Sequence, residues 1–296
     1  MEGLDAGVEW LSAPGAVARA GVRACSAGAG GGEVGVLVLA RAAKGNAWND
    51  AMWRDWGEAV RLLETRDTVR VVVLLAEGPL FTGGLDLGHL AATLATHTAP
   101  GACPARARLA FRTSITAMQD AYTRLERASW PVVAAVHGAC IGAGVDLVTA
   151  CDLRYCTQDA YFCVKEVDVG ITADLGTLQR LPAIVGHGVA AEMALTARRV
   201  GGQEAAALGL VARCLPSRRE LVVHALAVAD DIAAKSPLAV WGTKRVLLQT
   251  RDGLGSGVEA GLAGVAAHNA AFLLSDDIAR VVQARAAKRP PQFSKL

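Results

Sequence analysis

Short apolar runs alternate along the first two thirds of the chain with segments in which apolar residues recur every three or four positions. Three runs, at residues 33–41 (EVGVLVLAR), 69–78 (VRVVVLLAEG) and 130–139 (WPVVAAVHGA), consist mainly of Val, Leu and Ala. Continuous apolar runs of this length are typical of strands buried on both faces of a parallel sheet. A further strand is predicted over residues 153–164.

The segment after the first run has the spacing of an amphipathic helix. Between residues 50 and 67 the apolar positions fall three and four apart on one face, and Asn49 precedes them as a helix N-cap. Residues 91–107, rich in Ala, Thr and Pro, predict a loop or an irregular helix, and a helix follows at about 108–128. The apolar face of the first helix is formed by Met52, Trp56, Ala59, Val60 and Leu63.

Helical patterns dominate the chain beyond residue 186. Strands that alternate with helices, followed by a helical tail, predict an α/β core with an α-helical C-terminal part. The segments with helical spacing are 188–197, 219–235, 237–249 and 275–288.

The composition supports a substantial folded core and argues against several function classes. Of the 296 residues, 52% are hydrophobic and 20% are charged, a balance that disordered chains do not have. A net charge of +2, without blocks of like charge, and an aromatic content of 5% argue against nucleic-acid binding. No apolar run approaches the roughly 18 residues that a membrane-spanning helix requires.

Residues that bind metals or dinucleotides do not form a convincing site in the sequence. The seven cysteines show no C-x-x-C spacing and the six histidines are scattered, so we predict reduced core thiols and no metal. GHGVAA at 186–191 has dinucleotide-binding spacing, but Pro182 interrupts the strand that should precede it. A tight turn that opens a helix is the better interpretation.

Two glycine-marked turns, at 81–87 (FTGGLDL) and 137–146 (HGACIGAGVD), each join a predicted strand to the start of a helix. The first amides of a helix have no partner within it, and small residues leave them accessible. If the turns face each other, they offer two backbone N–H groups to one carbonyl oxygen, which is an oxyanion hole. From these residues alone, two ordinary strand-to-helix connections are an equal alternative.

An apolar stretch at 164–181 (VKEVDVGITADLGTLQRL) carries three carboxylates, Glu166, Asp168 and Asp174. Because an isolated carboxylate is costly to remove from water, a buried one needs a partner or a purpose. For any single acid among them, a solvated loop edge is the alternative.

The two ends of the chain bear on its location. The sequence ends in Ser-Lys-Leu, a tripeptide that the peroxisomal import receptor reads at a free C-terminus. We therefore predict that receptor as a partner and a peroxisome or related organelle as the location, with the mitochondrion as the alternative. Residues 1–32, rich in Ala and Gly, contain early acids unlike a secretory signal and predict a poorly ordered extension.

Several of these segments together resemble the crotonase, or enoyl-CoA hydratase/isomerase, superfamily, and the middle segment is most similar to its dienoyl-CoA isomerases. The resemblance implies an α/β fold with a crotonase-like spiral of ββα units at 33–225 and an α-helical trimerisation region at 226–296. It implies a homo-oligomer, either a trimer or a dimer of trimers. It also implies an acyl-CoA substrate, with coenzyme A as part of that substrate and no cofactor. The segments that carry it are 44–50 (KGNAWND), 81–87, 131–155, 164–182, 235–240 and 243–248.

The resemblance also assigns roles to individual residues. Glu166 matches the carboxylate that handles the proton next to the thioester carbonyl. Asp174 matches an aspartate of the dienoyl-CoA isomerases at a place where hydratases commonly have glycine, and Asp146 matches an acid that is usually glutamate in hydratases. Asp168 has no catalytic counterpart, and we interpret it as structural. The implied oxyanion donors are the backbone N–H groups of Leu85 and Ala143, where Ala143 replaces the usual glycine, and the implied substrate-binding residues are Gly83, Gly84, Gly142 and Gly144.

These roles lead to a mechanistic hypothesis, the conversion of a 3,5-dienoyl-CoA into a 2,4-dienoyl-CoA. Glu166 removes the α proton, the two amides stabilise the dienolate oxygen, and a protonated Asp174 protonates the distal carbon. Burial among Val169, Ile171 and Leu175 is expected to raise the pKa of Asp174.

Alternatives of the same and of other classes remain open at this point. A 2-enoyl-CoA hydratase would add water to one double bond, and a 3-enoyl-CoA isomerase needs only one shuttling carboxylate. A non-catalytic acyl-CoA-binding protein is the alternative from another class, and Ala143 is the only feature that favours it. RNA binding occurs in the superfamily, but the near-neutral charge argues against it here.

Overall fold

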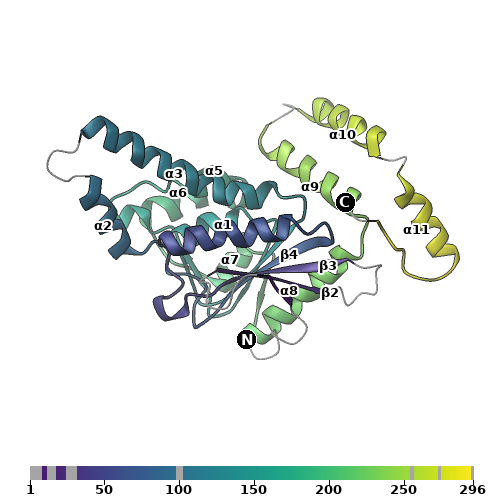
Figure 1. Ribbon diagram of the computed structural model, residues 1–296, viewed down its shortest axis with the longest axis horizontal. Coiled ribbons are helices and arrows are strands. Elements are labelled where there is room, and N and C mark those ends of the chain that lie inside the picture. The colour runs from purple at the N-terminus through teal and green to yellow at the C-terminus, as the bar shows by residue number, and fades with distance from the viewer. Residues whose placement is uncertain are drawn as a thin grey trace.

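The computed structural model describes residues 9–11, 18–24, 32–97, 103–253, 257–272 and 275–294. Its centre is a sheet in which the described strands follow the order β1-β2-β3-β4-β5-β7-β10. Figure 1 labels β2, β3 and β4 of this sheet. The strands from β3 to β10 are parallel, and β1 and β2 are antiparallel at one edge. The strands are β1 (Glu9–Trp10), β2 (Ala18–Ala24), β3 (Glu33–Leu39), β4 (Val69–Ala76), β5 (Val132–Val136), β7 (Leu153–Thr157) and β10 (Arg213–Leu215).

The apolar runs of the sequence form the middle of this sheet. All residues of β4 and β5 are buried, as are those of β3 from Val34 onward. Because side chains alternate between the two faces of a strand, each run must be covered on both sides. The three predicted strands at 33–41, 69–78 and 130–139 are therefore confirmed, with slightly shorter bounds.

Helices cover the two faces of the sheet, with α1 (Asp50–Glu64) on one side and α8 (Arg218–Ala233) on the other (Figure 1). The Asn49 side chain caps α1 by accepting a hydrogen bond of 3.0 Å from the Met52 amide. The buried residues of α1 are those that the helical spacing predicts. On the opposite face, Leu221, Ala225, Ala229 and Ala233 of α8 pack against the Val-rich strands.

A second, smaller sheet contains β6 (Ala139–Ile141), β8 (Tyr161–Cys163) and β9 (Val200–Gly201). The sequence predicted one strand over 153–164, but the structure divides this stretch into β7 and β8. Exposed Gln158 and Asp159 form a turn between them, and the Gln158 amide bonds to Leu215 O at 2.9 Å. Polar residues at this turn thus move the chain from the first sheet to the second.

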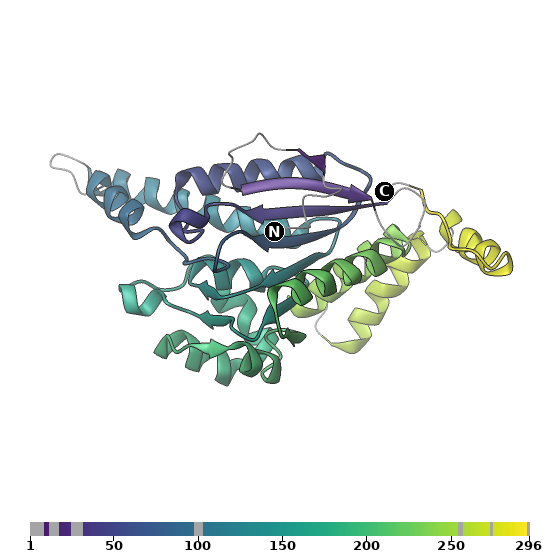
Figure 2. The same cartoon turned by 90° about the horizontal axis from the view of Figure 1, so that it is seen from below.

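Two helices project from one end of the molecule, α2 (Leu87–His97) and α3 (Pro104–Arg127) (Figures 1 and 2). The sequence predicted a loop or irregular helix over 91–107, but the chain is regularly helical up to His97 and again from Pro104. Alanine favours helix more than any other residue, and proline fits the first helical position. The helix predicted at 108–128 is confirmed, with an earlier start.

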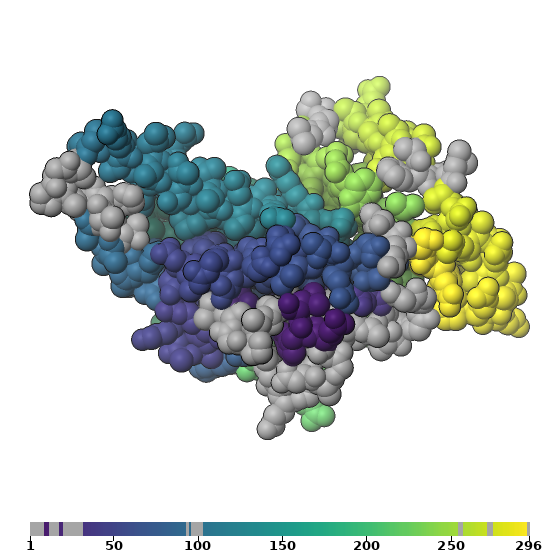
Figure 3. Space-filling view, in the orientation of Figure 1, coloured from purple at the N-terminus to yellow at the C-terminus, as the bar shows by residue number. Residues whose placement is uncertain are grey.

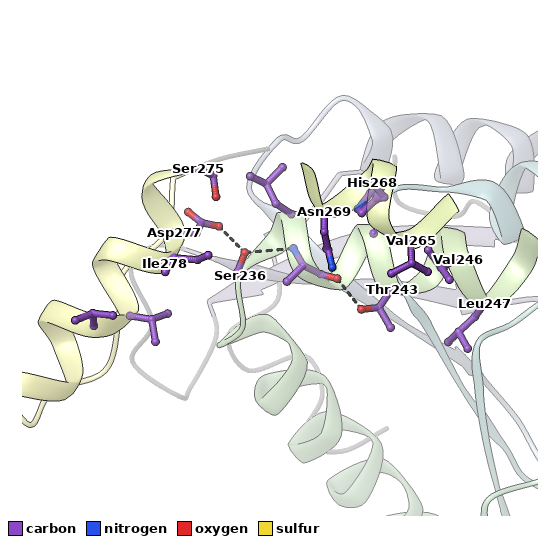
Figure 4. A pocket seen from close by; sticks show the side chains of 15 residues that line it. Ser236, Thr243, Val246, Leu247, Val265, His268, Asn269, Ser275, Asp277 and Ile278 are labelled. Atoms are coloured by element: carbon purple, nitrogen blue, oxygen red, sulfur yellow. Dashed lines mark hydrogen bonds between the residues drawn. The ribbon is translucent and has the colours of Figure 1, made fainter. Parts of the chain in front are cut away.

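The C-terminal helices α9 (Pro237–Arg251), α10 (Val258–Phe272) and α11 (Asp276–Ala286) project at the other end. Figure 3 shows a hollow between these helices and α3. The helices predicted at 237–249 and 275–288 are confirmed, whereas α10 was not predicted. A mainly apolar cavity of about 520 Å³ lies among the three helices, and the Ser236 hydroxyl hydrogen-bonds to Asp277 at its margin (Figure 4).

Part of the N-terminal segment belongs to the sheet. Strand β2 pairs with β3 along its whole length, so the sheet extends into the segment 1–32 that was predicted as an extension. Four of the described cysteines are buried and none is disulfide-bonded, while Cys25 lies outside the described residues. In the described part of the chain, no helix is long and apolar enough to cross a membrane.

Candidate active site

The two glycine-marked turns lie directly against each other. Thr82 forms an isolated parallel bridge with Cys140, through hydrogen bonds of 3.0 Å from Thr82 N to Ala139 O and 3.1 Å from Ile141 N to Thr82 O. At Gly84 the backbone has φ +84°, and a β-carbon there would lie 2.7 Å from Ile141 O. Only glycine permits this approach, so the sequence prediction of two facing turns is supported.

The backbone amides of Leu85 and Ala143 lie on these two turns. The Trp48 backbone is hydrogen-bonded to the residues on either side of Leu85. The Trp48 N–H donates to Gly84 O at 2.8 Å, and the Trp48 carbonyl accepts from Asp86 N at 2.9 Å. Ala143 is the first residue of α4 (Ala143–Thr149), where an amide has no partner within the helix. Within the described residues, neither amide donates a hydrogen bond to another protein group. Both amides therefore retain an unused donor.

Glu166 lies beside the second turn, in the short 3-10 helix η2 (Glu166–Val169). Glu166 is only 8% exposed, and a β-carbon on Gly142 would lie 3.3 Å from Glu166 Oε1. Oε2 is buried and has no hydrogen-bond partner among the described residues. Burial, followed by the charges of Asp146 and Asp174, raises the pKa of Glu166 to about 7. The side chain is thus suited to exchange a proton near neutral pH.

Asp146 is a second buried carboxylate, 1% exposed on α4. Its Oδ1 accepts a hydrogen bond of 2.6 Å from the backbone N–H of Thr177, the first residue of α5 (Thr177–Val185). Burial raises the pKa of Asp146 to about 6, although the hydrogen bond from Thr177 opposes this shift. Asp146 therefore links α4 to the start of α5.

Asp174 is the third carboxylate, and here the structure corrects one expectation. We predicted that Val169, Ile171 and Leu175 would bury it, but only Leu175 is buried, and Val169 and Ile171 are 41% and 37% exposed. Asp174 itself is exposed in the single chain. Partial desolvation still raises its pKa, and its charge raises the pKa values of Glu166 and Asp146. The three acids therefore form one electrostatic group.

Asp168 does not belong to this group. It is exposed and forms an ion pair with Lys165 three residues earlier. A solvated pair of this kind contributes little to stability and has no access to a buried site. Its interpretation as a structural residue stays a prediction.

The sequence did not single out Tyr122 of α3, which lies close to the acids. Its ring is 5.4 Å from that of Trp48 and 5.2 Å from that of Trp53, and the residue is fully buried. Burial, together with the charges of Asp146 and Glu166, raises its pKa well above the usual value, so the phenol remains protonated. Its hydroxyl has no partner within the described part of the chain. A helical pattern alone cannot distinguish such a residue from an ordinary core tyrosine.

A substitution at Gly84 tests the packing of the two turns. Gly84→Ala should lower the free energy of unfolding by about 1–3 kcal/mol, because alanine is strained at φ +84° and its methyl group meets Ile141 O. It should also reduce turnover, since Leu85 follows directly. Thermal unfolding and a steady-state assay measure the two effects. Gly57→Ala on α1 is the control, because a β-carbon there would meet nothing within 4 Å; equal effects at both positions would contradict the assignment.

Comparisons with known proteins show which family the chain resembles. A model of the family described as enoyl-CoA hydratase/isomerase matches residues 30–295. The peroxisomal Delta(3,5)-Delta(2,4)-dienoyl-CoA isomerase of Arabidopsis thaliana is 46% identical over 88% of this chain and 92% of its own length. The mitochondrial enzyme of that name from Rattus norvegicus is 42% identical over 88% and 79%. The crystal structure of an enoyl-CoA hydratase from Bacillus anthracis has a TM-score of 0.77 at 27% identity, covering 88% of this chain and 95% of that one.

Proposed function

The chain belongs to the enoyl-CoA hydratase/isomerase family, and we propose that it converts 3,5-dienoyl-CoA thioesters into 2,4-dienoyl-CoA thioesters. The predicted family and the crotonase-like α/β fold are confirmed. Relatives at 42–46% identity over most of the chain carry the name of this isomerase, which supports an isomerase of fatty-acid oxidation acting on acyl-CoA. The division into 33–225 and 226–296 stays a prediction.

One observation carries the choice of reaction: two carboxylates act on each other, Glu166, which lies beside the turn that carries Ala143, and Asp174, whose charge raises the pKa of Glu166. We propose that the Leu85 and Ala143 amides donate to the thioester oxygen. Glu166 removes a proton from C2, and the negative charge delocalises over the conjugated system onto that oxygen. Asp174 then delivers a proton to C6, so the double bonds move from positions 3 and 5 to positions 2 and 4. One proton leaves and one arrives, and the acyl chain is neither oxidised nor reduced.

The protonation states require a contribution from the substrate. Catalysis needs Glu166 ionised and Asp174 protonated, but in the free chain Glu166 is buried and Asp174 is exposed. We propose that the apolar acyl chain covers Asp174 when it binds and raises its pKa further, which shifts the proton toward Asp174. Substrate binding would thus establish the acid and base assignment. Asp146, tied to Thr177, would hold the start of α5 beside the site.

The alternatives differ in what they require of the site. A hydratase must activate water with two acids near one double bond, and a 3-enoyl-CoA isomerase requires only Glu166. Neither uses a carboxylate at position 174, on a segment of its own. No metal cluster is formed by the described residues, and the proposed proton transfer is complete without a cofactor, with coenzyme A as part of the substrate.

Three thioesters offered side by side test the proposed function. We expect 3,5-dienoyl-CoA to yield a growing ultraviolet absorbance of conjugated 2,4-dienoyl-CoA. We expect crotonyl-CoA to lose little absorbance through hydration and 3-enoyl-CoA to react much more slowly. Faster hydration than dienoyl isomerisation would favour the hydratase, and thermal stabilisation by all three without turnover would favour a non-catalytic binding protein.

We also propose a location and an oligomeric state for the chain. Relatives reside in peroxisomes and in mitochondria, and the terminal Ser-Lys-Leu leads us to propose the peroxisome, with its import receptor as a partner. Imaging of a fluorescent fusion with and without the last three residues tests this. We also propose a trimer or a dimer of trimers built through the C-terminal helices, and light scattering of the purified chain would reveal any other state.

A further inference from the structure

Arg180, buried on α5, joins two elements near the candidate site that lie far apart in the sequence. Its Nε and Nη2 donate to the two carboxylate oxygens of Glu126 on α3, at 3.0 and 3.2 Å. Nη2 also donates to Thr123 Oγ1 at 3.2 Å, and Nη1 donates to Leu175 O at 3.2 Å. The guanidinium therefore connects α3 to the backbone immediately after Asp174.

Gly176 allows the guanidinium to rest on this backbone. Its φ is +126°, and a β-carbon at this position would lie 1.7 Å from Arg180 Nη1. The guanidinium thus occupies the space that any side chain at residue 176 would need. This close packing holds the turn between Asp174 and Thr177 in one conformation.

That turn controls two of the three acids. Asp174 stands at its beginning, and Thr177 at its end donates to Asp146 Oδ1. From α3, Gln119 Nε2 also donates to Asp174 O at 2.6 Å. Glu166 lies on a different segment, next to Gly142, and no contact joins it to Arg180 in the described part of the chain.

Glu126 is buried and shared with a second arginine. Arg251, the last residue of α9, donates to Glu126 Oε1 at 2.5 Å. Burial alone would raise the pKa of Glu126, but the hydrogen bonds from Arg251 and Arg180 lower it, so the carboxylate is ionised. A planar guanidinium can make the bidentate contact and reach Leu175 O at the same time, whereas a lysine ammonium cannot.

We propose that Arg180, anchored by Glu126, is a positioning residue that sets the place of Asp174 relative to the far end of the acyl chain. Arg180 thereby affects the second proton transfer, from Asp174 to C6. The first transfer, from C2 to Glu166, does not depend on it. The inference rests on the proposed isomerase function and assigns it a residue that touches no substrate.

The experiment measures two rates for each variant: dienoyl isomerisation, and exchange of the C2 hydrogens of 3,5-dienoyl-CoA with deuterium from D2O. Arg180→Lys should lower kcat for isomerisation by about 10- to 100-fold, as expected for a small misplacement of a reacting group. The rate of exchange at C2 should stay within about threefold, and KM within about twofold, of the wild-type values, because Glu166 and the amides remain in position. Arg124→Gln is the control, since its ion pair with Glu64 joins α3 to α1 and does not touch the turn.

Equal loss of both rates, or unchanged isomerisation in folded Arg180→Lys, would overturn the inference. Should changes at residue 180 prevent folding, Arg251→Gln removes one partner of Glu126 and keeps the buried pair. A selective fall in isomerisation of about two- to fivefold then supports the inference, and a fall in both rates or in neither overturns it. If the unchanged protein exchanges C2 hydrogens but forms no 2,4-dienoyl-CoA, the proposed function fails instead.

Discussion

Asp174→Asn is expected to lower kcat for dienoyl isomerisation by about 10²- to 10⁴-fold, the range that a positioned general acid contributes. Asparagine has nearly the same shape but cannot donate the proton that C6 requires. The two amides and Glu166 are untouched, so the Kd for an acyl-CoA should change by less than about threefold. The appearance of 2,4-dienoyl-CoA absorbance measures the rate, and calorimetry with a saturated acyl-CoA measures binding.

Asp168→Asn is the matched control for this variant. Asp168 lies in the same stretch and carries the same carboxylate, but it faces solvent and pairs with Lys165. It should keep nearly full activity. If Asp174→Asn retained turnover comparable to that of this control, Asp174 could not be the acid, and a single carboxylate would have to shuttle the proton.

Glu166→Gln should have an effect at least as large, again about 10²- to 10⁴-fold in kcat, because the first proton transfer then lacks its base. Unlike Asp174→Asn, it should also abolish exchange of the C2 hydrogens with D2O. The folded structure should persist, since glutamine fits the same volume and Oε2 has no described hydrogen-bond partner to lose. Retained C2 exchange in a folded Glu166→Gln variant would assign the base to another residue.

The pH profile of the unchanged protein provides a second measure of Glu166. The base must be ionised, and the pKa of its carboxyl is raised to about 7. Because Asp174 must at the same time be protonated, the pair needs one proton in total, and the free enzyme loses that proton as Glu166 titrates. The value of kcat/KM reports the free enzyme, so it should fall about tenfold per pH unit above 7 and change little just below 7. A profile that is flat from pH 5 to 8 would contradict the assignment.

The sequence predicted the parts of the fold that depend on local pattern. The β3 and β4 runs and the face of α1 follow directly from the burial of apolar residues at the periods of strand and helix. The break between β7 and β8 was missed because an apolar count averages over the polar pair Gln158–Asp159. The start of α2 was predicted, but its regular continuation to His97 was not, because Thr and Pro nearby obscured an alanine-rich segment that is helical.

The candidate site was predictable where chemistry marks the residues, and only there. The carboxylates and glycines can be recognised in the sequence. In the structure Gly84 lies against Ile141 on the other turn, and Gly142 lies against the Glu166 carboxylate. Thr177 and Arg180 were not found, because their significance arises from contacts across 31 and 57 residues of chain. Tyr122 was not found because its ring contacts reach Trp48 and Trp53, still further away in the sequence. The exposure of Asp174 was also unpredictable, since it depends on how far the segment around it stands out from the core.

The indoles beside Tyr122 make the chain its own optical reporter. The ring centres of Trp53 and Trp56 lie 4.3 and 5.6 Å from that of Trp48, and the Trp48 backbone is hydrogen-bonded to the residues on either side of Leu85. Excitation energy passes readily between rings at such separations, so light absorbed by any one of them is emitted from the group as a whole. The share of the intrinsic fluorescence that comes from these three of the six tryptophans therefore follows events at that loop without an attached dye.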